Sequence, residues 1–485
     1  MFFKGLSCIF DKTKPRKWAK STKIGVSFFQ TMTKIHKISQ FQHSFQFFNA
    51  EEHFNVIYQD FLESNLGKIH EAIPWHCLDQ TFKIKENTKG PACIFSPKGK
   101  IALMFLKNYS CSSDERLIEQ LNSNVHYQLF CDLLLQPGQK LKSFKIASQI
   151  RCELAKGLDI KASQKQLAKM WLPYMRDIDK ATTDATCYES LVRYPTNQKL
   201  LWESVEWSYH QMKLICKHLK IKSPRTKFNK WKSRYYDYSR KRRKPQKDKR
   251  VLTRALLHLL DKLIEELAKI ETHQDFNMPP KYFARILIIK KVLEQQSVLF
   301  TTGENPTNRI VSLAKDYIRP IVRGKEVKPV EFGAKVNKVQ IDGINFIEHV
   351  DFNAFNEGTR FISTVQLAQE LTHTKLNIMG ADAIYATNKN RTYATSKQIK
   401  TDFTRKGRAG KHEDERKILA KMITKERASR LEGSFGKEKE HYHLKRVRAR
   451  TKKNEILWIF CGIHVANALE IGRRKAANQN NKQVA

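Results

Sequence analysis

The sequence has no Cys-x-x-Cys pair, although it contains nine cysteines. The cysteines are scattered and odd in number, so neither a zinc site nor a disulfide framework is indicated, and reduced thiols are the simpler expectation. Long apolar runs are also missing. The longest one near the C-terminus, 456–469, is shorter than the roughly 20 residues that a membrane-spanning helix needs, and residues 1–10 are too interrupted for a signal peptide. We therefore expect a soluble cytoplasmic protein with no membrane partner.

Acidic residues are scarce beside basic ones. The chain carries 89 Lys and Arg against 48 Asp and Glu, which gives a formal net charge of +41. The usual physical use of such an excess is to bind phosphate backbones, so nucleic acid is the expected partner. A ribosome-like or merely soluble basic protein is the alternative. A hydrophobic content of 41% over 485 residues excludes a wholly disordered chain and allows roughly two to four domains.

The most basic stretch is 222–250, where aromatic residues are interleaved with Lys and Arg and only Asp237 and Asp248 are acidic. Basic groups neutralise phosphates, and aromatic rings stack on exposed bases or pack against sugars. A solvated basic helix is the alternative, but it would not explain so many aromatics. We therefore predict a DNA-contact segment. Its expected contacts are Arg225, Lys227, Lys230, Trp231, Arg234, Arg240, Arg242 and Arg243.

Periodicity divides the chain into six segments. Residues 1–50 have no steady period and are expected to be a poorly ordered basic arm or a small helix. Residues 51–172 follow a helical pattern, and we expect a helical N-terminal domain that binds DNA, a purely structural helical layer being the alternative. We then expect the first part of a catalytic core at 173–204, a helical insertion at 205–322, the rest of the core at 323–470 and a flexible tail at 471–485.

The core segments alternate between strand and helix patterns. The Thr- and Ala-rich run around Asp184 favours a strand. Amphipathic helices at 251–270 and 282–299 predict a helical hairpin whose apolar stripe is either a core or a dimer seam. Alternation at 330–336 and the pair Asp342-Gly343 predict a β-hairpin, followed by a helix at 361–371, a strand ending before Asp382 and a late helix with Glu432. Without the insertion this is a ribonuclease-H-like order, an α/β core with a mixed sheet whose first and fourth strands are neighbours.

Three acids, Asp184, Asp382 and Glu432, fall where a metal-dependent DNA-cutting site needs them, two at strand ends and one on the late helix. Carboxylates are suitable ligands for Mg²⁺ or Mn²⁺. Two such ions, about 4 Å apart, stabilise the attacking and leaving oxygens of a phosphodiester, so the acids should lie within about a dozen ångströms of one another. We expect Asp184 to be shared, Asp382 to complete one metal site and Glu432 the other. The stand-ins that the sequence leaves open are Asp177 and Asp179 for the first acid and Glu426 for the third.

Residues close to the third acid complete the predicted site. Lys439 lies seven residues after Glu432, and so on the same helix face if the helix continues between them. We predict that Lys439 holds a phosphate beside the scissile bond, with Tyr442 and Arg427 as further DNA contacts.

Taken together, these blocks resemble the DDE transposases of bacterial insertion sequences, in the broad group typified by insertion sequences 4 and 5. The resemblance spans roughly residues 95–470. It implies a ribonuclease-H-like core with Asp184, Asp382 and Glu432 as catalytic triad, Mg²⁺ dependence, and a homodimer on double-stranded DNA at the bacterial nucleoid. That enzyme would bind terminal inverted repeats, cleave them and join them to target DNA. The matching blocks are 184–190, 193–203, 322–325, 331–336, 355–358, 381–385 with Asn390 and Arg391, and 432–435 with Lys439, Tyr442 and Leu444.

Two features depart from the pattern of that group. The group has an Arg four residues before the Glu, where this chain has Ala428, so Arg427 or Arg430 is left to take its part. The helical insertion lies between the first acid and the hairpin, whereas better-known members have theirs after the second acid. A nuclease that cuts without joining and an inactive transposase-derived DNA-binding protein are the alternative functions.

Overall fold

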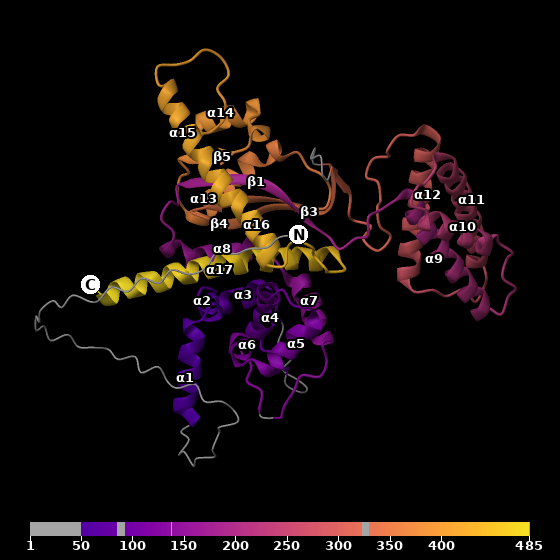
Figure 1. Ribbon diagram of the computed structural model, residues 1–485, viewed down its shortest axis with the longest axis horizontal. Coiled ribbons are helices and arrows are strands. Elements are labelled where there is room, and N and C mark those ends of the chain that lie inside the picture. The colour runs from indigo at the N-terminus through magenta and orange to yellow at the C-terminus, as the bar shows by residue number, and fades with distance from the viewer. Residues whose placement is uncertain (1–49, 85–92, 137, 323–328, 485) are drawn as a thin grey trace, which may run out of the picture. The chain divides into compact units, whose positions relative to one another are not determined.

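The computed structural model describes residues 50–84, 93–136, 138–322 and 329–484, which form a mixed α/β fold (Figure 1). The expected α/β class is thereby confirmed. The chain divides into the units 1–53 and 54–485. The arm predicted at 1–50 lies outside the described residues except for Ala50, as do positions 323–325 of one resemblance block.

The N-terminal region is helical, as the periodicity predicted. Ser113 begins one of its helices by accepting the N–H of Arg116, and Asp114 and Glu115 lie in the first turn, where acids interact well with the helix dipole. The apolar faces of these helices belong to the larger of two hydrophobic cores. The helices are α1 (Ala50–Glu63), α2 (Asn65–Glu71), α3 (Trp75–Thr81), α4 (Pro97–Ser110), α5 (Asp114–Ser123), α6 (Val125–Phe130), α7 (Lys145–Gly157), α8 (Ile160–Trp171) and the short η2 (Leu172–Tyr174).

The sheet is mixed and its long central strand is the one that carries Asp184. The strands run in the order β2-β3-β1-β5-β6, with β4 paired to β3. β3 is antiparallel to β1, β2 and β4, whereas β5 is parallel to β1 and to β6. Asp342 and Gly343 both have positive φ, 46° and 80°, and form the turn of the predicted hairpin. The strands are β1 (Lys180–Glu189), β2 (Pro320–Val322), β3 (Val330–Ile341), β4 (Ile344–Asp351), β5 (Ile378–Ala381) and β6 (Lys400–Thr401).

The segment 205–322 contains the predicted helical insertion, but the insertion begins earlier. Its helices are α9 (Asn197–His218), α10 (Phe228–Arg240), α11 (Gln246–Glu271) and α12 (Pro280–Thr302), and they share a second hydrophobic core of their own. Leu200, Leu201 and Trp202 belong to that core, so the predicted boundary at 205 is wrong by about two helical turns. The stripe on α11 packs inside the insertion, with Leu256, Leu260 and others fully buried, and is a core and not a dimer seam.

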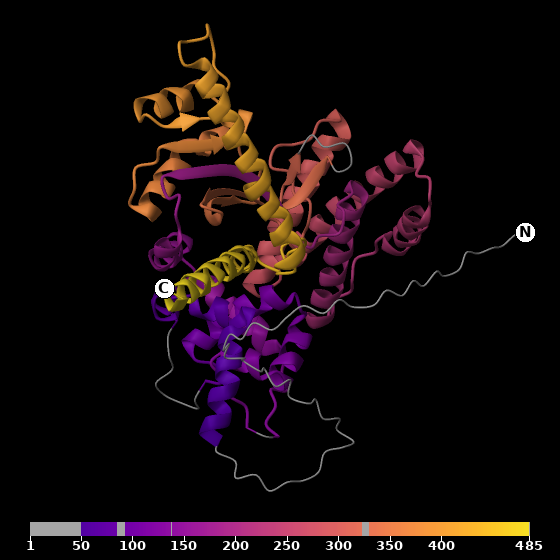
Figure 2. The same ribbon diagram turned by 60° about the vertical axis from the view of Figure 1, so that its left-hand side comes forward.

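The last part of the chain surrounds the sheet with helices and ends in a long core helix (Figures 1 and 2). α17 (Lys452–Val484) packs on α2, α4, α7 and β4. It is long and apolar enough to cross a membrane, but 89% of its apolar window is buried inside the protein, as in the core helix of a soluble protein. The other helices are η3 (Glu357–Arg360), α13 (Phe361–Thr372), η4 (Ala383–Tyr385), α14 (Asn388–Ser396), α15 (Glu413–Glu426), the π-helix η5 (Arg427–Glu432) and α16 (Gly433–His441).

The flexible tail predicted at 471–485 is wrong for most of its length, because α17 continues to Val484. Ion pairs dock the first turns of this stretch. Arg474 Nη1 lies 2.7 Å from Asp342 Oδ2, and Lys475 Nζ lies 2.6 Å from Glu71 Oε2. The prediction relied on the polar composition of the segment, which does not reveal such partners.

Candidate active site

The parallel pairing of β1 and β5 brings the first two acids together. The paired residues run from Lys180 opposite Ile378 to Thr183 opposite Ala381, so Asp184 and Asp382 are the next residues of two adjacent strands. Asp382 follows β5 directly, as predicted. Asp184 is not at a strand end, because β1 continues to Glu189 and is held there by β3.

All three predicted acids surround one guanidinium, that of Arg427. Its Nη1 lies 3.2 Å from Glu432 Oε1 and 3.9 Å from Asp184 Oδ2, and its Nη2 lies 3.8 Å from Asp382 Oδ1. The Arg427 side chain is only 13% exposed, and its Nε is buried without a hydrogen-bond partner. Acids that are 50 to 248 residues apart in the sequence therefore converge on a single cation.

A π-helical turn explains why Arg427, five residues before Glu432, reaches the acids. At about 100° per residue, an α-helix would place residues five apart roughly 140° from each other around its surface. In η5 the hydrogen bonds join residues five apart, which brings Arg427 and Glu432 to one side. Arg430, the other residue considered for this part, pairs instead with Glu426 at 2.6 Å and Asp342 at 3.4 Å.

The stand-in acids lie outside this cluster. Asp177 pairs with Lys180 at 2.8 Å, and Asp179 accepts a hydrogen bond from the Asn377 side chain at 2.9 Å. Glu426 is the partner of Arg430. Asp184 and Glu432, and not the stand-ins near them in the sequence, are thus the acids that face Arg427.

The electrostatics of the cluster favour a further cation. Burial raises the pKa of Asp184 to about 6, with the charges of Glu357 and Asp382 acting in the same direction and the Ala185 N–H and Arg427 against it. One guanidinium therefore leaves several carboxylates under mutual repulsion. A carboxylate whose pKa is raised in this way gains most from an added positive charge.

Two further acids belong to this neighbourhood and were not predicted as site residues. Asp402 follows β6, accepts the Ala381 N–H at 3.0 Å, and has its pKa raised by burial and by Asp382. Asp402 has the same sequence feature as Asp382, an acid directly after a parallel strand. However, β6 is only two residues long, so its strand pattern could not be recognised. Glu357 pairs with Lys335 at 2.7 Å and lies in the block 355–358 noted in the sequence.

Lys439 lies on the helix face that its spacing predicted, whereas Tyr442 is not exposed as its predicted DNA contact requires. α16 continues unbroken from Gly433 to His441, and Lys439 Nζ donates to Thr186 Oγ1 at 3.0 Å, two residues along β1 from Asp184. Tyr442 is 5% exposed and packs in the main core. The Tyr442 ring is therefore part of the core and is not available for the DNA contact that the sequence predicted.

A buried polar cluster fixes α16 against the sheet beneath the acids. The Glu438 carboxylate is 1% exposed and accepts both from Lys338 Nζ, at 2.7 Å to each oxygen, and from Asn345 Nδ2 at 3.1 Å. The Tyr188 hydroxyl donates to the same carboxylate. Lys338 lies opposite Asp184 in the β1–β3 register. Sequence reasoning missed this pair, since a buried Lys-Glu contact 100 residues apart has no local signature.

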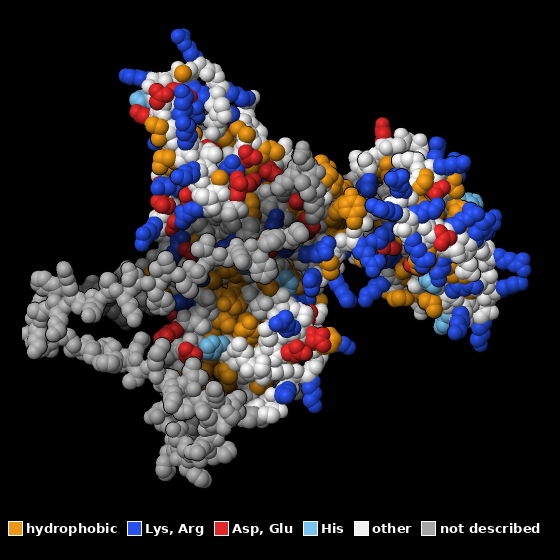
Figure 3. Space-filling view, viewed as in Figure 1, with side chains coloured by type: hydrophobic (Ala, Val, Ile, Leu, Met, Phe, Trp, Pro, Cys, Tyr) orange, Lys and Arg blue, Asp and Glu red, His pale blue; other side chains and the backbone are white. Residues whose placement is uncertain are grey.

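The basic segment lies on α10 and its flanks, and its arginines and lysines are exposed. Figure 3 shows the insertion covered with Lys and Arg and few acids between them. The aromatic residues, however, pack on α9: Phe228 stacks on Tyr209 at 3.8 Å and Tyr235 on Trp202 at 4.9 Å. Packing explains these aromatics, so the argument for base stacking does not hold for them. The exposed basic residues are Arg225, Lys227, Lys230, Arg234, Arg240, Arg242 and Arg243.

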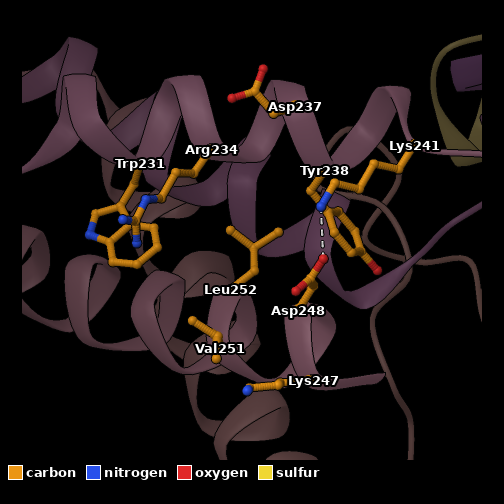
Figure 4. A pocket seen from close by; sticks show the side chains of 9 residues that line it. All are labelled: Trp231, Arg234, Asp237, Tyr238, Lys241, Lys247, Asp248, Val251 and Leu252. Carbon is orange, nitrogen blue, oxygen red and sulfur yellow. Dashed lines mark hydrogen bonds and ion pairs between the residues drawn. The ribbon is translucent and has the colours of Figure 1, made fainter. Parts of the chain in front are cut away.

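Trp231 lines a pocket of about 340 Å³ between α10 and α11 (Figure 4). Arg234 lies over its ring at 5.0 Å, and Lys241 pairs with Asp248 at 2.8 Å across the pocket. One face of the Trp231 indole and the ammonium group of Lys241 are therefore already occupied by partners within the chain.

The donor set suits a divalent cation, but the side chains are not arranged as a closed metal site. Within the described part of the chain, no three His, Cys, Asp or Glu side chains are close enough to hold one ion as they stand. The cation at the centre is Arg427, and the oxygens around it are hard carboxylate ligands of the kind that Mg²⁺ and Mn²⁺ prefer. The residues fit such an ion if the guanidinium moves aside.

Comparison with known proteins adds no relative. No protein-family model matches the chain, and no curated protein and no solved structure matches it either.

Proposed function

We propose that this chain is a DDE-type DNA transposase that binds terminal inverted repeats, cleaves their ends and joins them to target DNA. The observation that carries the proposal is the convergence of Asp184, Asp382 and Glu432 around Arg427. Three carboxylates brought from a central strand, the next parallel strand and a late helix are a costly arrangement, because their like charges repel. Such an arrangement is typical of sites that take metal ions and phosphates.

The sheet supports a ribonuclease-H-like core. The β3–β4 hairpin is antiparallel to β1 on one side, and β5 and β6 are parallel to it on the other. This is the order expected once the insertion is set aside, with the first and fourth core strands adjacent.

In the proposed site, Asp184, Asp382 and Glu432 would hold Mg²⁺ or Mn²⁺. Bound there, the ions supply Lewis-acid activation of water or a DNA 3′-hydroxyl and stabilise the leaving oxygen. Lys439, next to Thr186, is placed to hold a phosphate beside the acids. The exposed basic residues of the insertion neutralise phosphates farther along the duplex. The protein would work as a homodimer on double-stranded DNA in the bacterial cytoplasm, at the nucleoid.

The experiment that tests the proposal is Asp382→Asn, assayed with the DNA that flanks the open reading frame. We expect Mg²⁺-dependent cleavage to fall by about a hundred- to a thousandfold, the scale on which single electrostatic groups act in catalysis, while salt-sensitive DNA binding stays nearly unchanged. Asp414→Asn is the matched control, since Asp414 lies on α15 with a side chain that is 94% exposed and is not one of the three acids around Arg427. Cleavage that survives in Asp382→Asn would disprove the assignment.

Joining of a pre-cut end to plasmid DNA separates the proposal from its alternatives. Cleavage without joining indicates a nuclease. DNA binding with neither activity, in the wild type and with Mn²⁺ as well as Mg²⁺, indicates an inactive transposase-derived DNA-binding protein.

A further inference from the structure

A second pocket, away from the acids, lies beyond the far end of β1. It has a volume of about 340 Å³, within the range of roughly 300–1,000 Å³ of ordinary ligand pockets. Its walls come from the segment before α9, the segment after α12, and the sheet edge formed by β2 and β3. The Asn353 side chain donates to Asn308 Oδ1 at 3.1 Å and ties two of its walls together. The lining residues are Tyr194, Pro195, Asn305, Pro306, Asn308, Arg309, Arg319, Pro320, Val322, Val330, Phe332 and Asn353.

Among the described residues that line this pocket, Arg309 and Arg319 carry the charge and none is acidic. Arg309 Nη1 donates to Asn305 Oδ1 at 2.5 Å, and its Nε is buried without a partner. Arg319 donates to the carbonyls of Asp316 and Ile318.

Both guanidinium groups are half-buried, and no carboxylate of the described residues pairs with them. Neither forms an ion pair with a carboxylate of the described chain, in contrast to Arg360, Arg416 or Arg474. Burial lowers the pKa of Arg309 and of Arg319, which reflects a cost of holding the charges there. A phosphate would offset that cost, because the planar guanidinium fork matches two phosphate oxygens.

The rest of the pocket suits a sugar-phosphate unit. The Asn305, Asn308 and Asn353 side chains are polar and uncharged. Tyr194 is 73% exposed and meets Phe332 edge to face at 5.9 Å, which leaves the Tyr194 ring open to pack against a sugar.

The pocket has a defined place relative to the acids. Ser190, the first residue after β1, donates its N–H to the carbonyl of Phe332 at 2.9 Å and lies six residues from Asp184. Six extended residues span about 20 Å, so the pocket lies well apart from the acid cluster along the sheet.

We propose that the Arg309–Arg319 pocket binds one backbone phosphate of the DNA substrate, several nucleotides away from the phosphodiester held at the acid cluster. The inference rests on the proposed function for its ligand, a phosphodiester of DNA. The pocket then sets how the duplex crosses from the catalytic sheet toward the insertion.

The test is the salt dependence of duplex binding by Arg309→Gln and Arg319→Gln, measured by fluorescence anisotropy. We expect each variant to bind about tenfold more weakly and its slope of log affinity against log salt to fall by about 0.9, the loss of one phosphate contact. Arg285→Gln is the matched control, a partly exposed arginine of α12 outside the pocket, and it should change neither quantity. Arg309→Lys keeps the charge and should retain most of the salt slope while losing affinity, which separates binding from a folding defect.

A single neutral methylphosphonate, moved along the DNA that the wild type cuts, locates the contact. We expect it to weaken wild-type binding at one position several nucleotides from the cut and to have no effect on Arg309→Gln at that position. Wild-type affinity and slope in both glutamine variants would overturn the pocket, even if Asp382→Asn abolishes cleavage. The reverse result, a lowered slope in a protein that never cleaves DNA, would retain the pocket and overturn the proposed function.

Free phosphate and mononucleotides are the other source of the same chemistry. Calorimetric titration with inorganic phosphate and with a deoxynucleoside monophosphate should show binding no tighter than millimolar. Tighter binding that is lost in Arg309→Gln, with duplex binding unaffected, would assign the pocket to a free nucleotide and overturn the proposal.

Discussion

Arg427 is the residue on which the site depends in the state described. It neutralises part of the charge of three acids, and its side chain is 13% exposed. A divalent ion and this guanidinium would compete for the same oxygens. In the proposed function, Arg427 would act as an internal counter-ion that keeps the acids together until a metal and DNA bind.

Removing that counter-ion should tighten metal binding. We predict that Arg427→Gln binds Mn²⁺ about tenfold more tightly than the wild type. The reason is that the repulsion between two positive charges at about 4 Å costs at least 1 kcal/mol even in water. The metal-free variant should also be less stable and should recover with Mg²⁺. Calorimetry with Mn²⁺ and thermal unfolding with and without Mg²⁺ measure both effects.

The neighbouring Arg430 provides the control. It pairs with Glu426 and Asp342, so Arg430→Gln should leave the Mn²⁺ affinity as it is. Weaker Mn²⁺ binding by Arg427→Gln would mean that the arginine supports the metal site and does not compete with it.

At the scale of elements, the helix from α15 to α16 delivers the third acid, and the buried pair Lys338–Glu438 holds that helix on the sheet. Burial of this pair is costly unless both charges are present and hydrogen-bonded. Glu438 meets this condition with Lys338, Asn345 and Tyr188 as donors.

We predict that Glu438→Leu lowers the free energy of unfolding by about 3–5 kcal/mol, because Lys338 is then a buried charge without its partner. The double variant Lys338→Met with Glu438→Leu should recover a large part of this loss. Urea unfolding measures both.

A control lies two residues away on the same helix. Glu440 pairs with Lys445 at 2.8 Å on the surface, and Glu440→Gln should change the stability by less than about 1 kcal/mol. An equal effect of Glu438→Leu and Glu440→Gln would contradict the role of the buried pair.

Much of the fold could be predicted from the sequence where local signals are strong. The leucine stripe of 251–270 and the Asp342-Gly343 turn both appear where their patterns placed them. These features depend on neighbours within a few residues, so periodicity and turn chemistry are sufficient.

What could not be predicted depends on contacts between distant segments. Phe228 and Tyr235 pack on α9, Tyr442 lies in the core, and α17 continues to Val484. Asp402 was missed because β6 is too short to show a pattern. The position of Arg427 depends on a π-turn, which a sequence pattern based on α-helical spacing does not include.

For the whole molecule, buried histidines make stability depend on pH. His464 is fully buried, with Gln164 Oε1 at 3.1 Å from one ring nitrogen and Asn467 Nδ2 at 3.2 Å from the other. This environment suits the neutral ring, and burial lowers the pKa of His464 to about 3. His70 and His443 are shifted in the same direction, to pKa values of about 4, again mainly by burial.

The sign of the effect follows from these shifts. Below the ordinary pKa of 6.5 the unfolded chain binds protons that the folded protein does not, so stability falls as the pH falls from 6.5 toward 4. At about 1.4 kcal/mol per pH unit for one histidine, the wild type should lose about 2 kcal/mol more than His464→Gln between pH 6.5 and 5. Urea unfolding at these pH values measures the difference. Equal losses in both proteins would show that His464 is protonated in the folded state.

The most direct test of the central claim is to replace Mg²⁺ with Fe²⁺ and let ascorbate and peroxide cut the polypeptide next to the bound ion. We predict cuts near Asp184, Asp382 and Glu432 together, suppressed by excess Mg²⁺ and lost in Asp382→Asn, because one metal centre touches all three places. Cuts at only one of these places, or cuts that neither Mg²⁺ nor Asp382→Asn affects, would show that the three acids do not share a metal.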